Sequence, residues 1–421
     1  MKTGEASTRR IIAGSVGNTL EWYDFAVYGF FAPVIGRQFF PSDDPHVSLI
    51  SAFGVFAAGF LMRPLGSVFL GHVADKAGRR KALILSVALM AIPTTLIGVL
   101  PTYESIGIAA PIALTLLRLL QGLSVGGEYT GSSVYLYEIA PKNRRAFVVS
   151  WALVGVALGI LMGSGVATLA TSLLPDDDLA TWGWRIPFLF GLVVGITGFT
   201  IRRRNTAYAS DRPLSPYGPT DIPVVEIFRH HRTALLRTIA CNTLNGVSFY
   251  MVFVYLTTYL QTYSGLSEPD ALGMNTLTMV LYMALLPPIA FLADKTSRKS
   301  VMLFGTGLTA LAGLPLFWLL SHDNLTLVMI GQFGLTVALA FFFAPLMATM
   351  IAQFPSSVRV TGYSIGYNIP LAIFGGTSPL VATFLIDKTH LQLSPALYLI
   401  AAAILAFVVI WRMPHTENAP D

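Results

Sequence analysis

Five ionisable side chains stand within long apolar stretches of the first half of the sequence: Glu21, Asp24, Arg63, Arg118 and Glu128. A charge in such surroundings costs about 3 kcal/mol or more, so it is retained for a reason. Burial raises the pKa of a carboxyl group and a neighbouring arginine lowers it, and the two effects together can bring it near neutral pH. These residue types therefore indicate proton transfer beside an anion-binding guanidinium.

Their spacing places several of them on shared helix faces. Glu21 and Asp24 are three residues apart with Tyr28 in line, and Arg118 and Gln121 are also three apart. Counting from the ends of the apolar stretches places Glu21, Asp24 and Arg118 near mid-depth. We assign proton coupling to Asp24, Glu21 and Glu128, and substrate binding to Arg118, Arg63, Gln121 and Tyr28.

Two alternatives remain for this group. The charges can form a static ion-pair network that only locks the first helices together. Arg63 directly precedes Pro64 and can serve an inner gate instead of a binding site.

The second half offers neutral polar and aromatic side chains instead of charges. Those that share helix faces or depth are Asn242, Asn245, Tyr250, Tyr363 and Tyr367. We expect them to complete a binding pocket by hydrogen bonding and shape, and polar packing between helices is the alternative.

A further set of charges stands where apolar stretches end, at the predicted cytoplasmic side. We assign them to gates that open during transport, against the alternative that they only set topology. The predicted gating residues are Asp75, Arg79, Arg80, Glu138, Arg145 and Asp294. Glu138 is expected to pair with Arg144 or Arg145.

The elements that must position these residues are membrane-spanning helices. Of the 421 residues, 54% are hydrophobic and only 12% are charged, about half the charge of a soluble domain. The apolar runs are long and continuous, which favours helices over a barrel. Twelve spans are predicted, at residues 11–36, 47–72, 82–101, 107–139, 146–173, 185–202, 234–262, 269–293, 300–320, 324–353, 359–386 and 392–412.

Loop charges alternate along the chain. Basic clusters such as 79–81 and 202–204 alternate with acidic loops such as 176–178, which predicts an even number of spans with both termini in the cytoplasm. The net charge of +5 is therefore attributed to cytoplasmic loops and not to nucleic-acid binding. We expect a multi-pass protein of the plasma membrane, in bacteria the inner membrane.

The two halves repeat one another. Residues 71–81 carry a Gly, Asp and basic pattern that returns in weaker form at 290–299. We therefore predict an all-α fold of two six-helix bundles related by pseudo-two-fold symmetry. The bundles span residues 1–202 and 233–421, joined by a cytoplasmic linker at 203–232 that contains four prolines.

Several classes of function lack support. The single cysteine, Cys241, rules out an internal disulfide. We find no histidine spacing typical of a metal site, no phosphate-binding loop and no catalytic constellation. We expect no metal, no cofactor and no enzymatic activity. Gly155, Gly159 and Gly163 permit close helix contact, which we assign to contact between the halves of a monomer before a dimer face.

Four blocks and one loop carry a family resemblance. The loop at 71–81 resembles the signature loop of the major facilitator superfamily, and residues 17–25, 60–66, 118–129 and 182–188 resemble its metabolite:proton symporters. The resemblance implies uptake of a small metabolite driven by protons. Substrates of that family include 2-oxoglutarate, citrate, shikimate, proline and betaine.

We expect a secondary active transporter that imports a small carboxylate-bearing metabolite by proton symport with alternating access. Two arginines at membrane depth favour an anion or a zwitterion, and of these we favour an organic acid. Uptake of a zwitterion such as proline or betaine, and substrate exchange, are the alternatives. A receptor that reports ligand without moving it is a third, which the short central loop disfavours.

Overall fold

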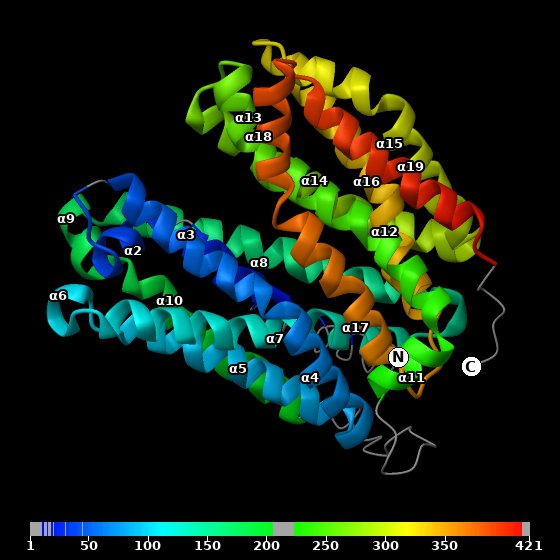
Figure 1. The fold of residues 1–421 in the computed structure, drawn as a ribbon, viewed down its shortest axis with the longest axis horizontal. Helices are drawn as coiled ribbons and strands as arrows, with labels where there is room; N and C mark the ends of the chain where they lie inside the picture. Colours follow the sequence, from blue (N-terminus) through cyan, green and yellow to red (C-terminus); the bar gives the residue numbers. More distant parts are fainter. Residues whose placement is uncertain are drawn as a thin grey trace, which may run out of the picture. The chain divides into compact units, whose positions relative to one another are not determined.

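The computed structural model describes residues 11, 15, 18–19, 21–29, 31–43, 45–204 and 223–414, and every regular element among them is a helix (Figure 1). Helices satisfy their own backbone hydrogen bonds, which long apolar runs require in lipid. Residues 205–222 of the predicted linker lie outside the described residues.

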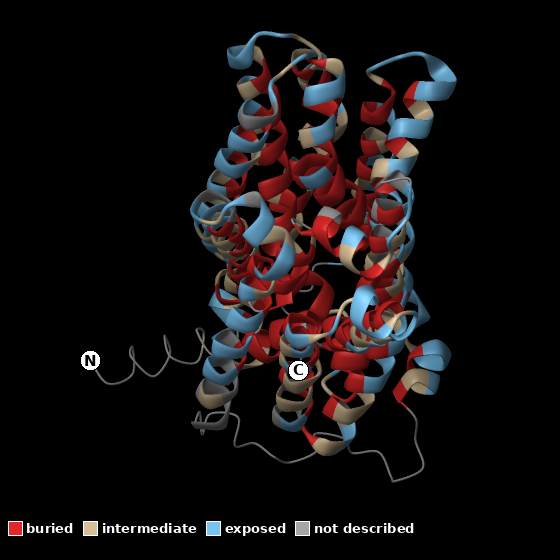
Figure 2. Ribbon diagram, turned by 90° about the vertical axis from the view of Figure 1, so that its left-hand side faces the viewer, coloured by how far each residue is buried: buried red, intermediate tan, exposed pale blue. Residues whose placement is uncertain are grey.

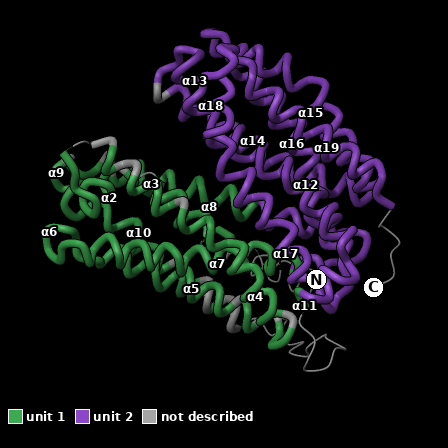
Figure 3. The backbone as a smooth tube through the Cα atoms, viewed as in Figure 1, with its two compact units in different colours: residues 1–135, 154–224 green, residues 136–153, 225–421 purple. Residues whose placement is uncertain are grey.

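The chain divides into two compact units, shown in different colours in Figure 3. Unit 1 comprises Met1–Tyr135 and Val154–Val224, and unit 2 comprises Leu136–Leu153 and Val225–Asp421. Besides helical residues 21–29, the helices of the chain as far as the linker are α2 (Ala32–Phe39), α3 (Pro45–Leu61), α4 (Arg63–Ala77), α5 (Arg79–Val99), α6 (Tyr103–Ile106), α7 (Ala109–Ile139), α8 (Arg145–Leu173), α9 (Asp176–Asp178) and α10 (Arg185–Arg204).

The helices that follow the linker belong to unit 2 from Val225 onward. They are α11 (Pro223–His230), α12 (Arg232–Tyr250), α13 (Leu256–Tyr263), α14 (Glu268–Lys295), α15 (Arg298–Leu320), α16 (Leu325–Ile351), α17 (Arg359–Pro370), α18 (Ser378–Thr389) and α19 (Ser394–Trp411). Two π-helical stretches, Met251–Tyr255 and Leu371–Gly375, join α12 to α13 and α17 towards α18. Gly246 of α12 faces Gly375 so closely that an added Cβ would lie 3.1 Å from its nitrogen.

Ten helices among the described residues are long and apolar enough to cross a membrane, and α5 contributes a shorter apolar stretch, Ile84–Val99. Many large apolar side chains face outward: Leu61 is 70% exposed, Leu311 84% and Leu380 71%. In Figure 2 buried residues face neighbouring helices and exposed residues occupy outward faces. Exposed apolar area of this extent fits a lipid environment and not water.

The segment 136–153, which contains the end of α7 and the start of α8, groups with the C-terminal helices. We predicted a boundary at residue 202 from the linker alone, and the six-plus-six division stays a prediction. Polar contacts that join this segment to the rest of unit 2 form part of the site described below.

Glycines bring α7 close to α3 and α4 within unit 1. An added Cβ at Gly122 would lie 2.1 Å from the carbonyl oxygen of Gly59, and one at Gly126 would lie 2.1 Å from that of Arg63. Only glycine permits this approach of two backbones. It holds α7, which carries Arg118, against α3 and α4.

The glycines of α8 serve the same purpose within unit 1. An added Cβ would lie 2.7 Å from Ser15 O at Gly155, 2.4 Å from Thr19 O at Gly159 and 2.7 Å from Ala26 Cβ at Gly163. The contact we expected between the halves is therefore a contact with the first helix, which the spacing alone could not distinguish.

Gly159→Ala is expected to lower the free energy of unfolding by about 2 kcal/mol, because the backbone of the first helix must move away from the added methyl group. Gly165→Ala on the same helix is the matched control, since nothing lies within 4 Å of its added Cβ. We expect that change to be neutral or stabilising by up to about 1 kcal/mol. Thermal unfolding of the purified variants checks both, and equal stabilities would contradict the close packing.

Candidate functional site

The centre of the site in unit 1 is the carboxylate of Asp24. Its Oδ2 accepts hydrogen bonds from Arg118 Nη1 at 3.1 Å and from Gln121 Nε2 at 2.8 Å. Arg118 Nη1 also donates to Gln121 Oε1 at 2.9 Å, and Gln121 Nε2 donates to Thr94 Oγ1 at 2.9 Å. The structure thus brings together three residues that spacing singled out and adds Thr94 of α5.

This network is buried, and some of its hydrogen-bond donors and acceptors are unused. Asp24, Arg118 and Gln121 are each at most 1% exposed. Even so, Asp24 Oδ1 and Arg118 Nε and Nη2 make no hydrogen bond within the described part of the chain. A buried charged group with unused donors or acceptors is costly, so the arrangement has capacity for a further polar partner.

Aromatic rings surround the guanidinium of Arg118. Its Cζ lies 4.1 Å from the ring centroid of Tyr28, 5.2 Å from that of Phe25 and 5.3 Å from that of Phe56. Tyr28 Oη donates to Ala52 O at 3.0 Å, which fixes its ring against α3. Phe25 and Phe56 were not predicted, because an aromatic residue in an apolar span gives no signal that separates it from packing.

Two further predicted charges form a separate pair. Arg63 Nη2 lies 3.8 Å from Glu21 Oε1, and both side chains are 1% exposed. The Cζ atom of Arg63 lies 5.0 Å from the ring centroid of Phe60 and 5.9 Å from that of Trp22. The side chain of Glu128 lies outside the described part of the structure.

In unit 2 the predicted polar residues are all buried. Asn242 Nδ2 donates to Thr238 O at 2.9 Å, and Asn245 Nδ2 donates to Asn242 Oδ1 at 3.0 Å. The rings of Tyr363 and Tyr367 lie 5.9 Å apart. The asparagine contacts stay within α12, as expected for the alternative of structural polar groups, and the pocket role of this set stays a prediction.

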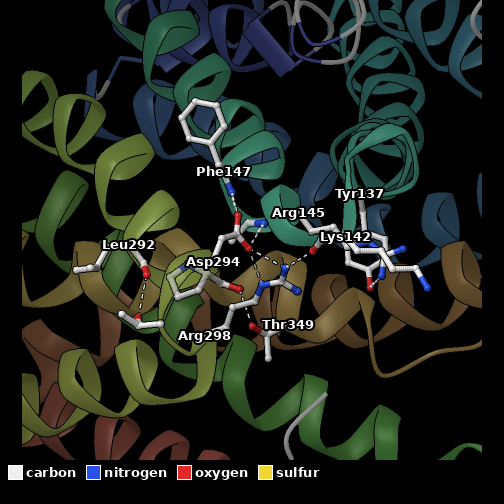
Figure 4. Close-up of polar contacts among 11 residues, drawn as sticks. Tyr137, Lys142, Arg145, Phe147, Leu292, Asp294, Arg298 and Thr349 are labelled. Atoms are coloured by element: carbon white, nitrogen blue, oxygen red, sulfur yellow. Dashed lines mark hydrogen bonds and ion pairs between the residues drawn. The ribbon is translucent and has the colours of Figure 1, made fainter. Parts of the chain in front are cut away.

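A second cluster, in unit 2, centres on Asp294 near the end of α14 (Figure 4). Its carboxylate accepts from the backbone nitrogens of Ala146 and Phe147 at 3.0 and 2.8 Å, in the first turn of α8. The partial positive charge of a helix N-terminus stabilises an anion there. Arg298 donates to Asp294 Oδ1 from Nε at 2.9 Å and from Nη2 at 2.7 Å, and also reaches Lys142 O at 3.2 Å.

Glu138 has a partner that we did not predict. Glu138 Oε1 accepts from Arg359 Nη1 at 3.1 Å. Arg145, one of the two expected partners, donates to Tyr137 Oη at 2.8 Å, and its Cζ lies 4.3 Å from the centroid of the Tyr137 ring. Residue spacing could not predict the Glu138–Arg359 pair, because 221 residues separate its members. The side chains of Asp75, Arg79 and Arg80 lie outside the described part of the structure.

Asp294→Asn is expected to destabilise the protein by about 3 kcal/mol, since its side chain is 0% exposed and Arg298 would lose its counter-charge. Asp387→Asn is the control, because that carboxylate is 71% exposed beside Lys388, and we expect a change below about 0.5 kcal/mol. Thermal unfolding of purified protein measures both. A tolerant Asp294 would remove the cluster from any role in holding α8 to α14.

Comparisons with known proteins bear on what this site belongs to. A family model described as "Sugar (and other) transporter" matches residues 11–203, and one described as "Major Facilitator Superfamily" matches residues 238–421. The glycine betaine/proline/ectoine/pipecolic acid transporter OusA of Dickeya dadantii is 35% identical over 98% of this chain and 84% of its own length. The chain belongs to the major facilitator superfamily.

Further relatives and solved structures are similar to this chain over most of its length. The proline/betaine transporter of Escherichia coli K12 is 33% identical over 98% of this chain and 84% of its own, and a putative proline/betaine transporter of Staphylococcus aureus COL is 36% identical over 97% and 89%. Among solved structures, the proton:xylose symporter XylE matches with a TM-score of 0.80 at 15% identity, over 98% of this chain and 97% of that one.

Membership confirms the fold class that the sequence predicted. The chain is a multi-pass membrane protein with the twelve-helix major facilitator fold, and it is a transporter of small molecules and not an enzyme. The human organic anion transporter MFSD10 also shares the fold, with a TM-score of 0.72 at 15% identity over 96% of this chain. At such identities these structures support the fold alone.

Proposed function

We propose that this transporter imports a small zwitterion of the betaine or proline type together with a proton. Two observations support the zwitterion over the organic acid that we first favoured. The curated relatives are named for proline, betaine, ectoine and pipecolic acid. The buried charges described in unit 1 also balance, because Arg118 pairs with Asp24 and Arg63 pairs with Glu21.

Charge balance matters because net charge is costly away from water. A zwitterion adds no net charge to this set, whereas an organic anion would need an unmatched cation. The observation that carries the proposal is the buried Asp24–Arg118 pair with unused hydrogen-bonding capacity on both partners.

The proposed mechanism follows from that pair. A substrate carboxylate offers Arg118 the two-oxygen acceptor that a guanidinium prefers. When Arg118 turns to it, Asp24 loses its counter-charge and accepts a proton, because an uncompensated buried carboxylate is costly. Release of substrate restores the pair and expels the proton. Transport then requires contacts that form and break, and those of Asp294 and Glu138 are our proposed gates.

We further propose that the protein works as a monomer in a bacterial inner membrane with both termini in the cytoplasm. The alternation of loop charge supports this orientation.

The test is uptake of labelled glycine betaine and proline by proteoliposomes with an alkaline interior. We expect accumulation that a protonophore abolishes, and no comparable accumulation of citrate or 2-oxoglutarate. Accumulation that persists after the proton gradient is collapsed would contradict proton coupling. Uptake of the organic acids in place of the zwitterions would contradict the substrate class.

A further inference from the structure

Three aromatic rings enclose the guanidinium of Arg118. Tyr28 and Phe56 stack at 5.8 Å, and Phe25 meets Phe56 edge-on at 5.5 Å. We call Phe25, Tyr28 and Phe56 the aromatic cage. All three lie within about 6 Å of the Arg118 Cζ, the range in which a ring face attracts a cation.

The cation inside the cage is held incompletely by hydrogen bonds. Within the described part of the chain, Nη1 is the only nitrogen of Arg118 that donates hydrogen bonds, and its acceptors are Asp24 Oδ2 and Gln121 Oε1. Nε and Nη2 make no hydrogen bond among the described residues. A guanidinium in a paired, two-pronged contact with a carboxylate is better satisfied than this, so a carboxylate of the right geometry would draw Arg118 out of the cage.

We propose that the aromatic cage is the binding site for the substrate's ammonium group and that Arg118 occupies it in this structure as a substitute cation. The inference rests on the proposed import of a zwitterion. Entry of the ammonium group displaces Arg118, which then binds the substrate carboxylate. The same displacement breaks the contact of Arg118 with Asp24, so substrate binding and proton uptake become one event.

The cage also predicts a preference among substrates. A quaternary ammonium group has no N–H to donate, so ring faces are the protein groups that attract it best. A neutral group of the same shape gains burial but not this attraction. The cage therefore predicts selection by charge between two ligands of equal size.

Glycine betaine and 3,3-dimethylbutyrate provide that comparison, because the second replaces the trimethylammonium group by tert-butyl and keeps the carboxylate. Calorimetry on the purified protein in lipid nanodiscs would give both dissociation constants. Their ratio is informative because the cost of displacing Arg118 is common to both ligands and cancels. We expect glycine betaine to bind about 10- to 30-fold more tightly than its isostere.

The variants separate the ring face from packing. Phe56→Leu removes one ring face that attracts the ammonium group and not its neutral isostere, so it should reduce the ratio to about threefold or less. Phe56→Trp should keep the ratio. Phe39→Leu is the matched control, since Phe39 is buried against Trp184 and makes no contact with Arg118 among those described.

If Phe56→Leu does not fold, Phe25→Leu is measured in its place and the same decrease is expected. A ratio unchanged by the loss of a cage ring, with both ligands still bound, would overturn the cage as the ammonium site and leave the proposed import standing. Failure of the wild-type protein to bind any zwitterion would instead overturn the proposed function, and this inference with it.

Discussion

Asp24→Asn is expected to abolish proton-driven accumulation while leaving exchange of substrate across the membrane in place. The amide keeps an oxygen for Arg118 and Gln121, which lie 3.1 and 2.8 Å from the carboxylate, but it cannot take up or release a proton. One pH unit corresponds to about tenfold accumulation for one proton per substrate. At a gradient of about two units, the wild type should approach about 100-fold and the variant about onefold.

Glu21→Gln is the matched control for this change. Glu21 is another buried carboxylate in the same helix, and its paired arginine is Arg63. We expect it to retain proton-driven accumulation, because it lies outside the contacts of Arg118. Accumulation at the wild-type level in Asp24→Asn would remove Asp24 from proton coupling, and loss in Glu21→Gln alone would transfer the role to Glu21.

Arg118→Lys is expected to weaken glycine betaine binding by at least about tenfold, or about 1.4 kcal/mol. Lysine keeps the charge that balances Asp24 but lacks the planar fork that meets both oxygens of a carboxylate. Direct binding to the purified variant, at a pH where Asp24 is in the same state as in the wild type, measures the loss.

Arg185→Lys serves as the control for replacing an arginine. Arg185 donates to the carbonyl oxygens of Gly98 and Leu100 at 3.2 and 2.7 Å, and these contacts do not involve Asp24. We expect its dissociation constant for glycine betaine to stay within about twofold of the wild type. An equal loss in both variants would mean that Arg118 acts on stability and not on substrate.

The sequence was sufficient to predict those features that follow from helix period and solvent. Asp24, Arg118 and Gln121 were placed together because charges in apolar spans are costly and because a spacing of three residues shares a face. The structure joins them through one carboxylate oxygen. The fold class followed from the length and number of apolar runs.

Other features depend on which helices meet, and a single sequence does not contain that information. Thr94 was missed because a threonine in a span usually bonds its own helix, as it also does here to Met90 O at 2.8 Å. The spacing of the glycines in α8 predicted close packing but did not show which helix would be in contact. The pairing of Glu138 with Arg359 was missed because 221 residues separate the two in the sequence.

The substrate class shows a different limit. Two arginines at membrane depth favour an anion or a zwitterion, and the residue types alone do not decide between them. The structure pairs each arginine with a carboxylate, so these pairs leave no excess positive charge for an organic anion. The names of the curated relatives point the same way, towards zwitterions.

The most direct test of proton coupling at Asp24 is the current that substrate evokes in proteoliposomes adsorbed on a capacitive sensor. A zwitterion carried with one proton moves one net positive charge inward, whereas a monocarboxylate anion carried with one proton moves none. We expect glycine betaine to evoke an inward positive current in the wild type and none in Asp24→Asn, although that variant still binds and exchanges it. A wild-type current in Asp24→Asn would contradict the account.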